Sequence, residues 1–118
     1  MSVQRLHTNR RMSQVVIHQN TVYLAGQVAA DDDLSADAAT QTRSTLNEIE
    51  KLLAEAGTDK TRLLSVTIYL KDIERDFEAM NSVWDTWLPE GTAPARATVE
   101  ARLCEPEILV EMSVVAAR

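Results

Sequence analysis

The sequence predicts an α+β fold: a mixed β-sheet with two helices on one face, in the order β-β-β-α-β-α-β-β. Short runs of alternating or β-branched apolar residues occur near both ends of the chain and once in its middle. Two longer segments between them place apolar residues three and four positions apart, as amphipathic helices do. The 118 residues contain no internal repeat, low-complexity tract or linker, so we expect a single domain over residues 1–118.

The N-terminal part predicts three strands. Val3–Thr8 is a candidate edge strand, and Gln14–His18 and Thr21–Ala25 are separated by Gln19-Asn20, a short turn typical of a hairpin. Gly26 ends the third run. A glycine there fits either a backbone with positive φ or a close approach of another group to the main chain.

The middle of the chain predicts a helix followed by a strand. Ser35 is the expected N-cap, small and apolar residues recur at helical spacing from Ala39 to Ala56, and Gly57 supplies the stop. Leu63–Leu70 then alternates as a strand.

A second amphipathic helix is predicted over Asp76–Leu88. Its apolar stripe includes Trp84 and Trp87. These tryptophans are either core residues or a ligand-stacking pair, and their helical spacing favours the core.

The C-terminal part predicts two strands, Ala95–Arg102 and Ile108–Ala116, with Pro94 at the start of the first. If these strands pair, Arg96 and Glu111 are the charges that sit well inside the sheet. They indicate a small-molecule site. The alternative is a solvated cross-strand ion pair, which contributes only a few tenths of a kcal/mol.

Charge and composition exclude several function classes. A net charge of −6 and a pI near 4.8 argue against binding nucleic acid. Neither a membrane-spanning run nor a signal peptide is visible, so we expect a cytoplasmic protein. Two histidines and the single Cys104 give no metal spacing, and no glycine-rich loop follows a strand, so neither a metal nor a cofactor is expected.

One face of the predicted sheet has no cover. Both helices lie on the other side, and the free face is expected to carry Thr98, Leu109 and Val115. A half-apolar face on so small a protein calls for a partner surface, and another copy of the chain is the expected partner.

The sequence resembles the Rid, or YjgF-like, reactive intermediate deaminases over nearly its whole length. The matching segments are Pro94-Ala95-Arg96, Val99 to Leu103, Glu111, Ala25-Gly26-Gln27 and Tyr69 to Asp72. The resemblance implies a chorismate-mutase-like fold of the bacillus type and a homotrimer with ligand sites in clefts between subunits. It also implies cofactor-free hydrolysis of 2-imino and enamine acids to 2-keto acids and ammonia.

The resemblance also implies roles for individual residues. Arg96 would grip the substrate carboxylate with two parallel donors, and Glu111 would orient and deprotonate a water. The peptide N–H of Thr98 and the main chain around Gly26 are candidate substrate donors. Met12 takes the place where many members have a cleft-closing tyrosine, so the phenolic hydrogen bond is missing.

Other departures point to a divergent subgroup. Thr98 stands where many members have a cysteine, which keeps the backbone donor but removes a thiol. Arg10 and Arg11 either add positive potential at the cleft mouth or are solvated loop charges. The alternative function is a non-catalytic trimer that binds a small carboxylate and regulates another process. A ribonuclease, an activity attributed to some relatives, conflicts with the acidic charge.

Overall fold

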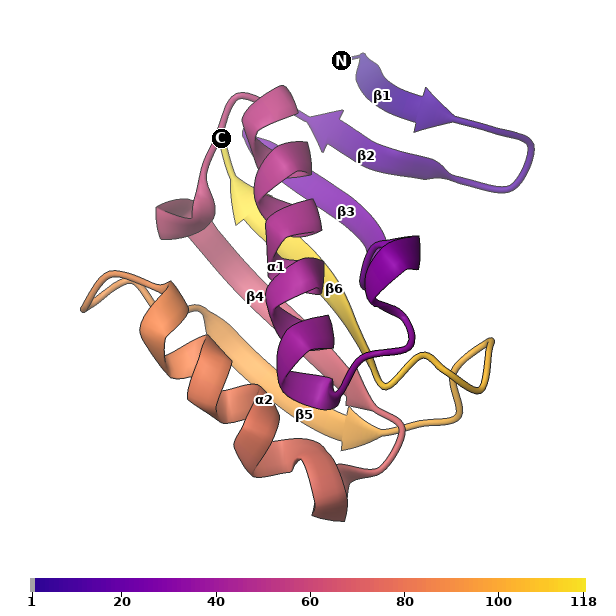
Figure 1. The fold of residues 1–118 in the computed structure, drawn as a ribbon. Coiled ribbons are helices and arrows are strands. Elements are labelled where there is room, and N and C mark those ends of the chain that lie inside the picture. The colour runs from indigo at the N-terminus through magenta and orange to yellow at the C-terminus, as the bar shows by residue number, and fades with distance from the viewer. Residues whose placement is uncertain (1) are drawn as a thin grey trace.

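The computed structural model describes residues 2–118 and confirms the predicted fold class and element order (Figure 1). The strands are β1 (Val3–Thr8), β2 (Ser13–His18), β3 (Thr21–Gln27), β4 (Leu63–Leu70), β5 (Ala95–Glu100) and β6 (Val110–Ala117). The helices are α1 (Ala38–Glu55) and α2 (Ile73–Trp87), with short 3₁₀ turns η1 (Asp31–Asp33) and η2 (Lys60–Arg62).

The strands form one mixed sheet in the order β1-β2-β3-β6-β4-β5. Every neighbouring pair is antiparallel except β4 and β5, which are parallel. A parallel pair needs a crossover connection, and α2 provides it between β4 and β5. The two edges of the sheet are therefore β1 and β5.

The expectation that the last two strands pair is wrong. β6 lies between β3 and β4, so β4 separates β5 from β6. Consecutive strands are neighbours in most sheets, but the crossover through α2 fixes β5 at the outer side of β4. The connection 101–109 then carries the chain back to the inner side of β4, where β6 enters the sheet.

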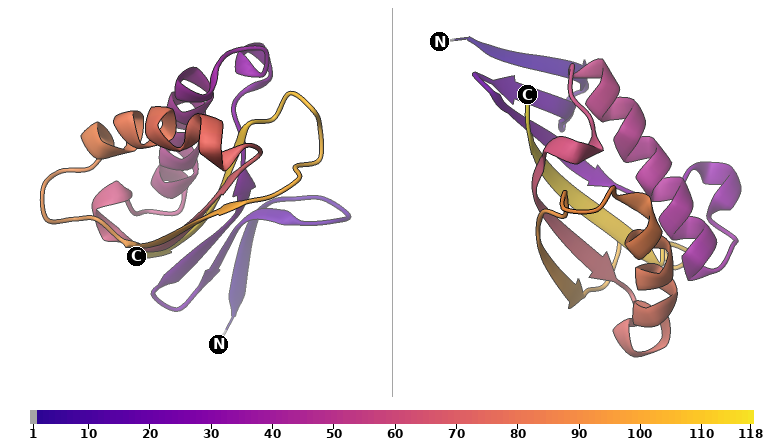
Figure 2. Two further views of the ribbon diagram at one scale, coloured as in Figure 1. Left: turned by 90° about the horizontal axis from the view of Figure 1, so that it is seen from below. Right: turned by 90° about the vertical axis from the view of Figure 1, so that its left-hand side faces the viewer.

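Both helices cover the same face of the sheet, as Figure 2 shows from two directions. This covered face contains the core. It buries alternate residues of the central strands against α1 and α2: Val22, Leu24, Val66, Ile68, Leu70, Val110, Met112 and Val114. Trp84 is only 7% exposed and belongs to this core, which decides between the two interpretations of that tryptophan.

Both long helices are capped by aspartates, and neither begins where the sequence predicts. Asp37, not Ser35, caps α1 by accepting a hydrogen bond from the Thr40 N–H at 3.0 Å. Asp72 caps α2 in the same way through the Arg75 N–H, so this helix starts at Ile73 rather than Asp76. A carboxylate satisfies N–H groups that the first turn of a helix leaves free.

The other face of the sheet carries no helix, and we call it the open face. Its strands present Tyr23, Tyr69, Glu111, Ser113 and Val115, residues that are exposed or half-buried. The Tyr23 side chain is 46% exposed to solvent. An uncovered face was expected.

Candidate functional site

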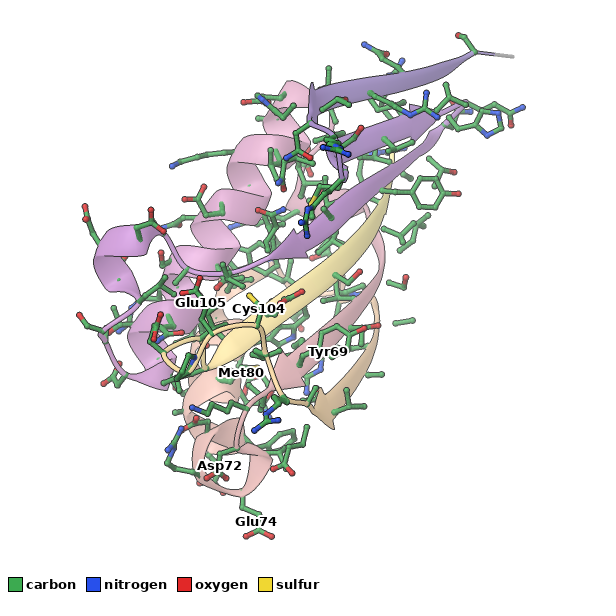
Figure 3. All side chains as sticks on the ribbon, turned by 90° about the vertical axis from the view of Figure 1, so that its right-hand side faces the viewer. Tyr69, Asp72, Glu74, Met80, Cys104 and Glu105 are labelled. Carbon is green, nitrogen blue, oxygen red and sulfur yellow. The ribbon has the colours of Figure 1, made fainter. Side chains whose placement is uncertain are left out.

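Glu111 lies in a cleft on the open face. In the ladder between β4 and β6 it is directly opposite Tyr69, and Ser113 is opposite Thr67. A hollow of about 330 Å³ opens beside it, and Figure 3 labels Tyr69 and Cys104 on its wall. This Glu111 cleft is lined by Gly26, Tyr69, Ala101, Arg102, Leu103, Cys104, Glu111 and Ser113.

Gly26 makes room for the Glu111 side chain. A Cβ atom at position 26 would lie 2.2 Å from Glu111 Oε2 and 3.0 Å from its Cδ. The ladder between β3 and β6 shifts register between Leu24 and Gln27, so a bulge places Gly26 against the carboxylate. Among residues 2–118 the glycines with positive φ are Gly57 and Gly91. A glycine is therefore needed at position 26 because the Glu111 side chain comes so close, and not because the backbone has a positive φ there.

One wall of the cleft belongs to the connection 101–109, and Gln41 on α1 holds that connection in place. Gln41 is fully buried; its amide donates to the Glu107 carbonyl at 2.8 Å, and its Oε1 accepts from the Leu109 N–H at 2.9 Å. At the other end of the connection the Ala101 N–H donates to the Leu70 carbonyl at 3.0 Å. The wall is thus tied to the core at both ends.

Arg96 is held on the covered side of the sheet, against α2. Its Nη1 donates to Asn81 Oδ1 at 2.8 Å, and its guanidinium carbon lies 5.3 Å from the centre of the Trp84 ring. A cation over an indole face is attracted by the ring's negative face. The remaining guanidinium N–H groups stay available for a carboxylate.

Within one chain Arg96 and Glu111 face opposite sides of the sheet. Arg96 is in register with Val66, which is buried under the helices, whereas Glu111 is in register with Tyr69. Positions 66 and 69 differ by an odd number, and side chains alternate along a strand. The two residues are also two strand spacings apart, about 10 Å across the sheet. One copy alone therefore does not bring them together.

Thr98 shares the side of Arg96, which corrects its expected place on the open face. It is in register with Ile68, a fully buried core residue. Its hydroxyl oxygen is buried and is without a hydrogen-bond partner within residues 2–118. N–H groups alternate in direction along a strand, and that of Ala101 points to β4. The Thr98 N–H, three residues earlier, therefore points to the free edge, where a ligand can accept from it.

Met12 lies in the turn between β1 and β2, outside the Glu111 cleft. The Asn9 side chain shapes this turn by accepting from the N–H groups of Arg11 and Met12. The Met12 side chain is 48% exposed, and its sulfur lies 3.9 Å from the amide nitrogen of Gln14. The structure thus places Gly26 against Glu111 and puts Arg96 and Thr98 on the same side of β5, while Met12 lies outside the Glu111 cleft.

Sequence reasoning did not assign Tyr69, Ser113 or Asn81 to a site, and it favoured a core role for Trp84. Tyr69 and Ser113 line the Glu111 cleft, while Asn81 and Trp84 hold Arg96. The alternation of β4 and β6 assigns Tyr69 and Ser113 to one face and would have found them. No local signal in the sequence connects Asn81 to a strand fifteen residues later.

A second hollow of about 330 Å³ lies between α1 and α2, remote from Glu111. Two of its polar groups, on Lys60 and Trp87, are already engaged with Glu50. Lys60 pairs with Glu50 at 3.5 Å, and the Trp87 indole N–H donates to the same carboxylate at 3.0 Å. The Glu111 cleft, by contrast, presents a carboxylate that makes no ion pair within residues 2–118.

Within residues 2–118 no three histidine, cysteine, aspartate or glutamate side chains are grouped to hold a metal ion. The same part of the chain has no helix with the length and apolar character required to span a bilayer. The connection 101–109 contains one group whose pKa is shifted. A hydrogen bond with Glu107 and the charge of that carboxylate raise the pKa of Glu105.

The mixed sheet with two helices on one face is an α+β fold that known structures share. A Neisseria meningitidis member of the YjgF protein family has the same structure: the TM-score is 0.93 at 40% identity, over 100% of this chain and 96% of that one. A Rid-family protein from Yersinia pestis gives a TM-score of 0.83 at 28% identity, over 94% of this chain and 90% of that one.

The sequence comparisons agree with the structural ones. The family described as "Endoribonuclease L-PSP" matches residues 2–118. The RutC family protein YoaB from Escherichia coli K12 is 44% identical over 117 residues, which are 99% of each chain. The chain therefore belongs to the Endoribonuclease L-PSP family, which includes the RutC, YjgF and Rid proteins, and the resemblance seen in the sequence is confirmed.

Proposed function

We propose that this chain hydrolyses reactive 2-imino and enamine acids to 2-keto acids and ammonia, at clefts between copies in a homotrimer. The observation that carries the proposal is the opposed placement of Arg96 and Glu111 on a sheet with an open face. Neighbouring residues hold Arg96 and Glu111 in defined positions, but within one chain the two side chains cannot contact the same ligand. A neighbouring copy supplies the missing half.

Arg96 supplies the binding step. The guanidinium is oriented by Asn81 and the Trp84 ring, and its free N–H groups match the two oxygens of a carboxylate. The outward N–H of Thr98 adds a backbone donor at the same sheet edge. Fixing the substrate at two points places its C=N carbon reproducibly, and such orientation lowers a barrier by several kcal/mol.

Glu111 supplies the proton transfer. The carboxylate accepts a proton from water as the water oxygen adds to the C=N carbon, and the electron pair of the C=N bond moves to nitrogen. Protonation of that nitrogen gives a carbinolamine. The C–N bond then breaks, ammonia leaves, and the hydroxyl loses its proton to form the keto group. The chemistry balances as imine plus water to ketone plus ammonia, with no redox change.

The experiment measures ammonia release from a 2-imino acid generated in solution by an amino acid oxidase. Glu111→Gln keeps the size of the side chain but removes the base, so we expect its acceleration to fall by about a hundredfold. Arg96→Gln is expected to raise the KM for the imine, and circular dichroism checks that both variants fold. Equal rates with wild type and Arg96→Gln would refute the proposal.

A carboxylate-binding trimer without turnover is the alternative. It is distinguished by saturable binding of keto acids that depends on Arg96, with no faster release of ammonia. The family description as an endoribonuclease has less support here, because a net charge of −6 opposes binding to a polyanion. A weak RNA affinity with little salt dependence would exclude that activity.

A further inference from the structure

The geometry points to Arg102 as a specificity-determining residue that binds a second carboxylate, so that the site takes 2-imino dicarboxylic acids. This inference rests on the proposed function, because it names the substrate class of the same site. Arg102 lines the Glu111 cleft, whereas Arg96 lies on the covered side of the sheet. Under the proposed function the Arg96 that meets a ligand in this cleft comes from a neighbouring copy, so the two arginines would approach the ligand from different sides.

Arg102 has no partner of its own within residues 2–118. Arg75 is paired with Asp76, Arg96 donates to Asn81, and Arg62 donates to the Arg118 carbonyl. Arg102 makes neither an ion pair nor a hydrogen bond in the same part of the chain. An arginine in a cleft with all of its side-chain donors free is suited to an external carboxylate.

The cleft adds neutral donors next to this cation. The hydroxyl groups of Tyr69 and Ser113 line the same hollow, and neither forms a hydrogen bond within residues 2–118. Such groups satisfy the oxygen lone pairs that a monodentate contact with arginine leaves free. Together with Arg102 they form a donor set that lines the cleft.

Charge balance also favours a second cation for a dianion. The protein carries a net charge of −6, and the cleft already contains the Glu111 carboxylate. A monocarboxylic imine needs only Arg96 to offset its charge. A dicarboxylic one adds a negative charge close to Glu111, which Arg102 offsets.

Hydrogen bonds hold the backbone on both sides of Arg102. The preceding residue, Ala101, is bound to the Leu70 carbonyl at 3.0 Å, and Gln41 fixes the connection farther along at Glu107 and Leu109. A donor on a tethered backbone loses less entropy on binding than one on a free loop. The Arg102 side chain is exposed, but it projects from a backbone that is tethered on both sides.

The test compares two keto acids that differ in one group. In 2-oxobutyrate a methyl group occupies the place of the distal carboxylate of oxaloacetate. Calorimetry is expected to show that the wild-type protein binds oxaloacetate about tenfold more tightly, and that Arg102→Gln removes most of this difference. The imines of aspartate and 2-aminobutyrate, generated by oxidases, are expected to show the same selectivity in kcat/KM. Arg43→Gln, on α1, is the control and is expected to leave the selectivity unchanged.

The two proposals fail in different ways. If no imine is hydrolysed faster but oxaloacetate binding still depends on Arg102, the deaminase assignment fails and the dicarboxylate site stands. If imines are hydrolysed but Arg102→Gln changes both substrates equally, or neither, the dicarboxylate site is overturned and the deaminase stands. Equal affinity of wild type for the two keto acids also overturns it.

Discussion

The carboxylate of Glu111 has its position because residue 26 has no side chain. In the bulged part of β3 the Gly26 backbone passes close to β6. The Glu111 carboxylate occupies the space that a side chain at position 26 would need. If Glu111 is the base of the proposed reaction, Gly26 influences that reaction only through the position of the Glu111 carboxylate. This role is a steric one, which distinguishes Gly26 from a glycine needed for a turn.

Gly26→Ala is expected to keep the fold and to impair the proton transfer. The added Cβ would lie 2.2 Å from Oε2, and the flexible end of the glutamate is the part that moves away. We expect the free energy of unfolding to change by less than about 1 kcal/mol, and kcat for imine hydrolysis to fall about tenfold or more.

A double-mutant cycle with Glu111→Gln provides the control for Gly26. If the alanine acts through Glu111, its effect on kcat disappears once the base has been removed. Independent, additive losses in kcat would contradict the steric account. A large loss of stability would contradict it as well.

At the level of elements, Gln41 joins α1 to the wall of the Glu111 cleft. This side chain is fully buried and makes four hydrogen bonds, with the carbonyls of Leu34, Ala36 and Glu107 and with the Leu109 N–H. A long helix and an irregular connection are thereby fixed to each other. The connection gains a defined path without strand pairing.

Gln41→Leu is expected to lower the free energy of unfolding by about 2–4 kcal/mol, because it leaves several buried backbone groups without partners. Urea denaturation measures the loss. Hydrogen exchange should quicken first in the connection 101–109. Gln4→Leu, on the exposed strand β1, is the matched control and is expected to change stability by less than about 0.5 kcal/mol. Unchanged exchange in the connection would show that Gln41 does not hold the wall.

The pattern of elements was accessible from the sequence, while the order of the sheet was not. Apolar periodicity identifies β4 and α2, because the covered face is continuous and the periods of two and 3.6 differ clearly. Nothing local in the strands β5 and β6 records that β4 lies between them. The same limit applies to the site. Arg96, Glu111 and Gly26 were identified one by one, but their faces depend on the pairing.

For the whole molecule, the opposed faces of Arg96 and Glu111 mean that the proposed reaction requires more than one copy of the chain. Because the two residues face opposite sides of one sheet, the proposed site would be complete only where two copies meet. The open face, with Tyr23 and Val115 exposed or half-buried upon it, is the apolar surface available for that contact. A closed ring of three copies repeats the same contact three times.

Mixing two inactive variants tests this arrangement. Arg96→Gln lacks the carboxylate anchor, Glu111→Gln lacks the base, and each alone is expected to be nearly inactive. In a closed ring, every mixed trimer contains one contact at which an intact Arg96 meets an intact Glu111. Random reassembly of equal amounts after mild denaturation should therefore restore roughly a quarter of the wild-type activity. If both residues of a site came from one chain, every site would keep a defect and no activity would return. Mixing either variant with itself is the control, and light scattering confirms that trimers have formed again.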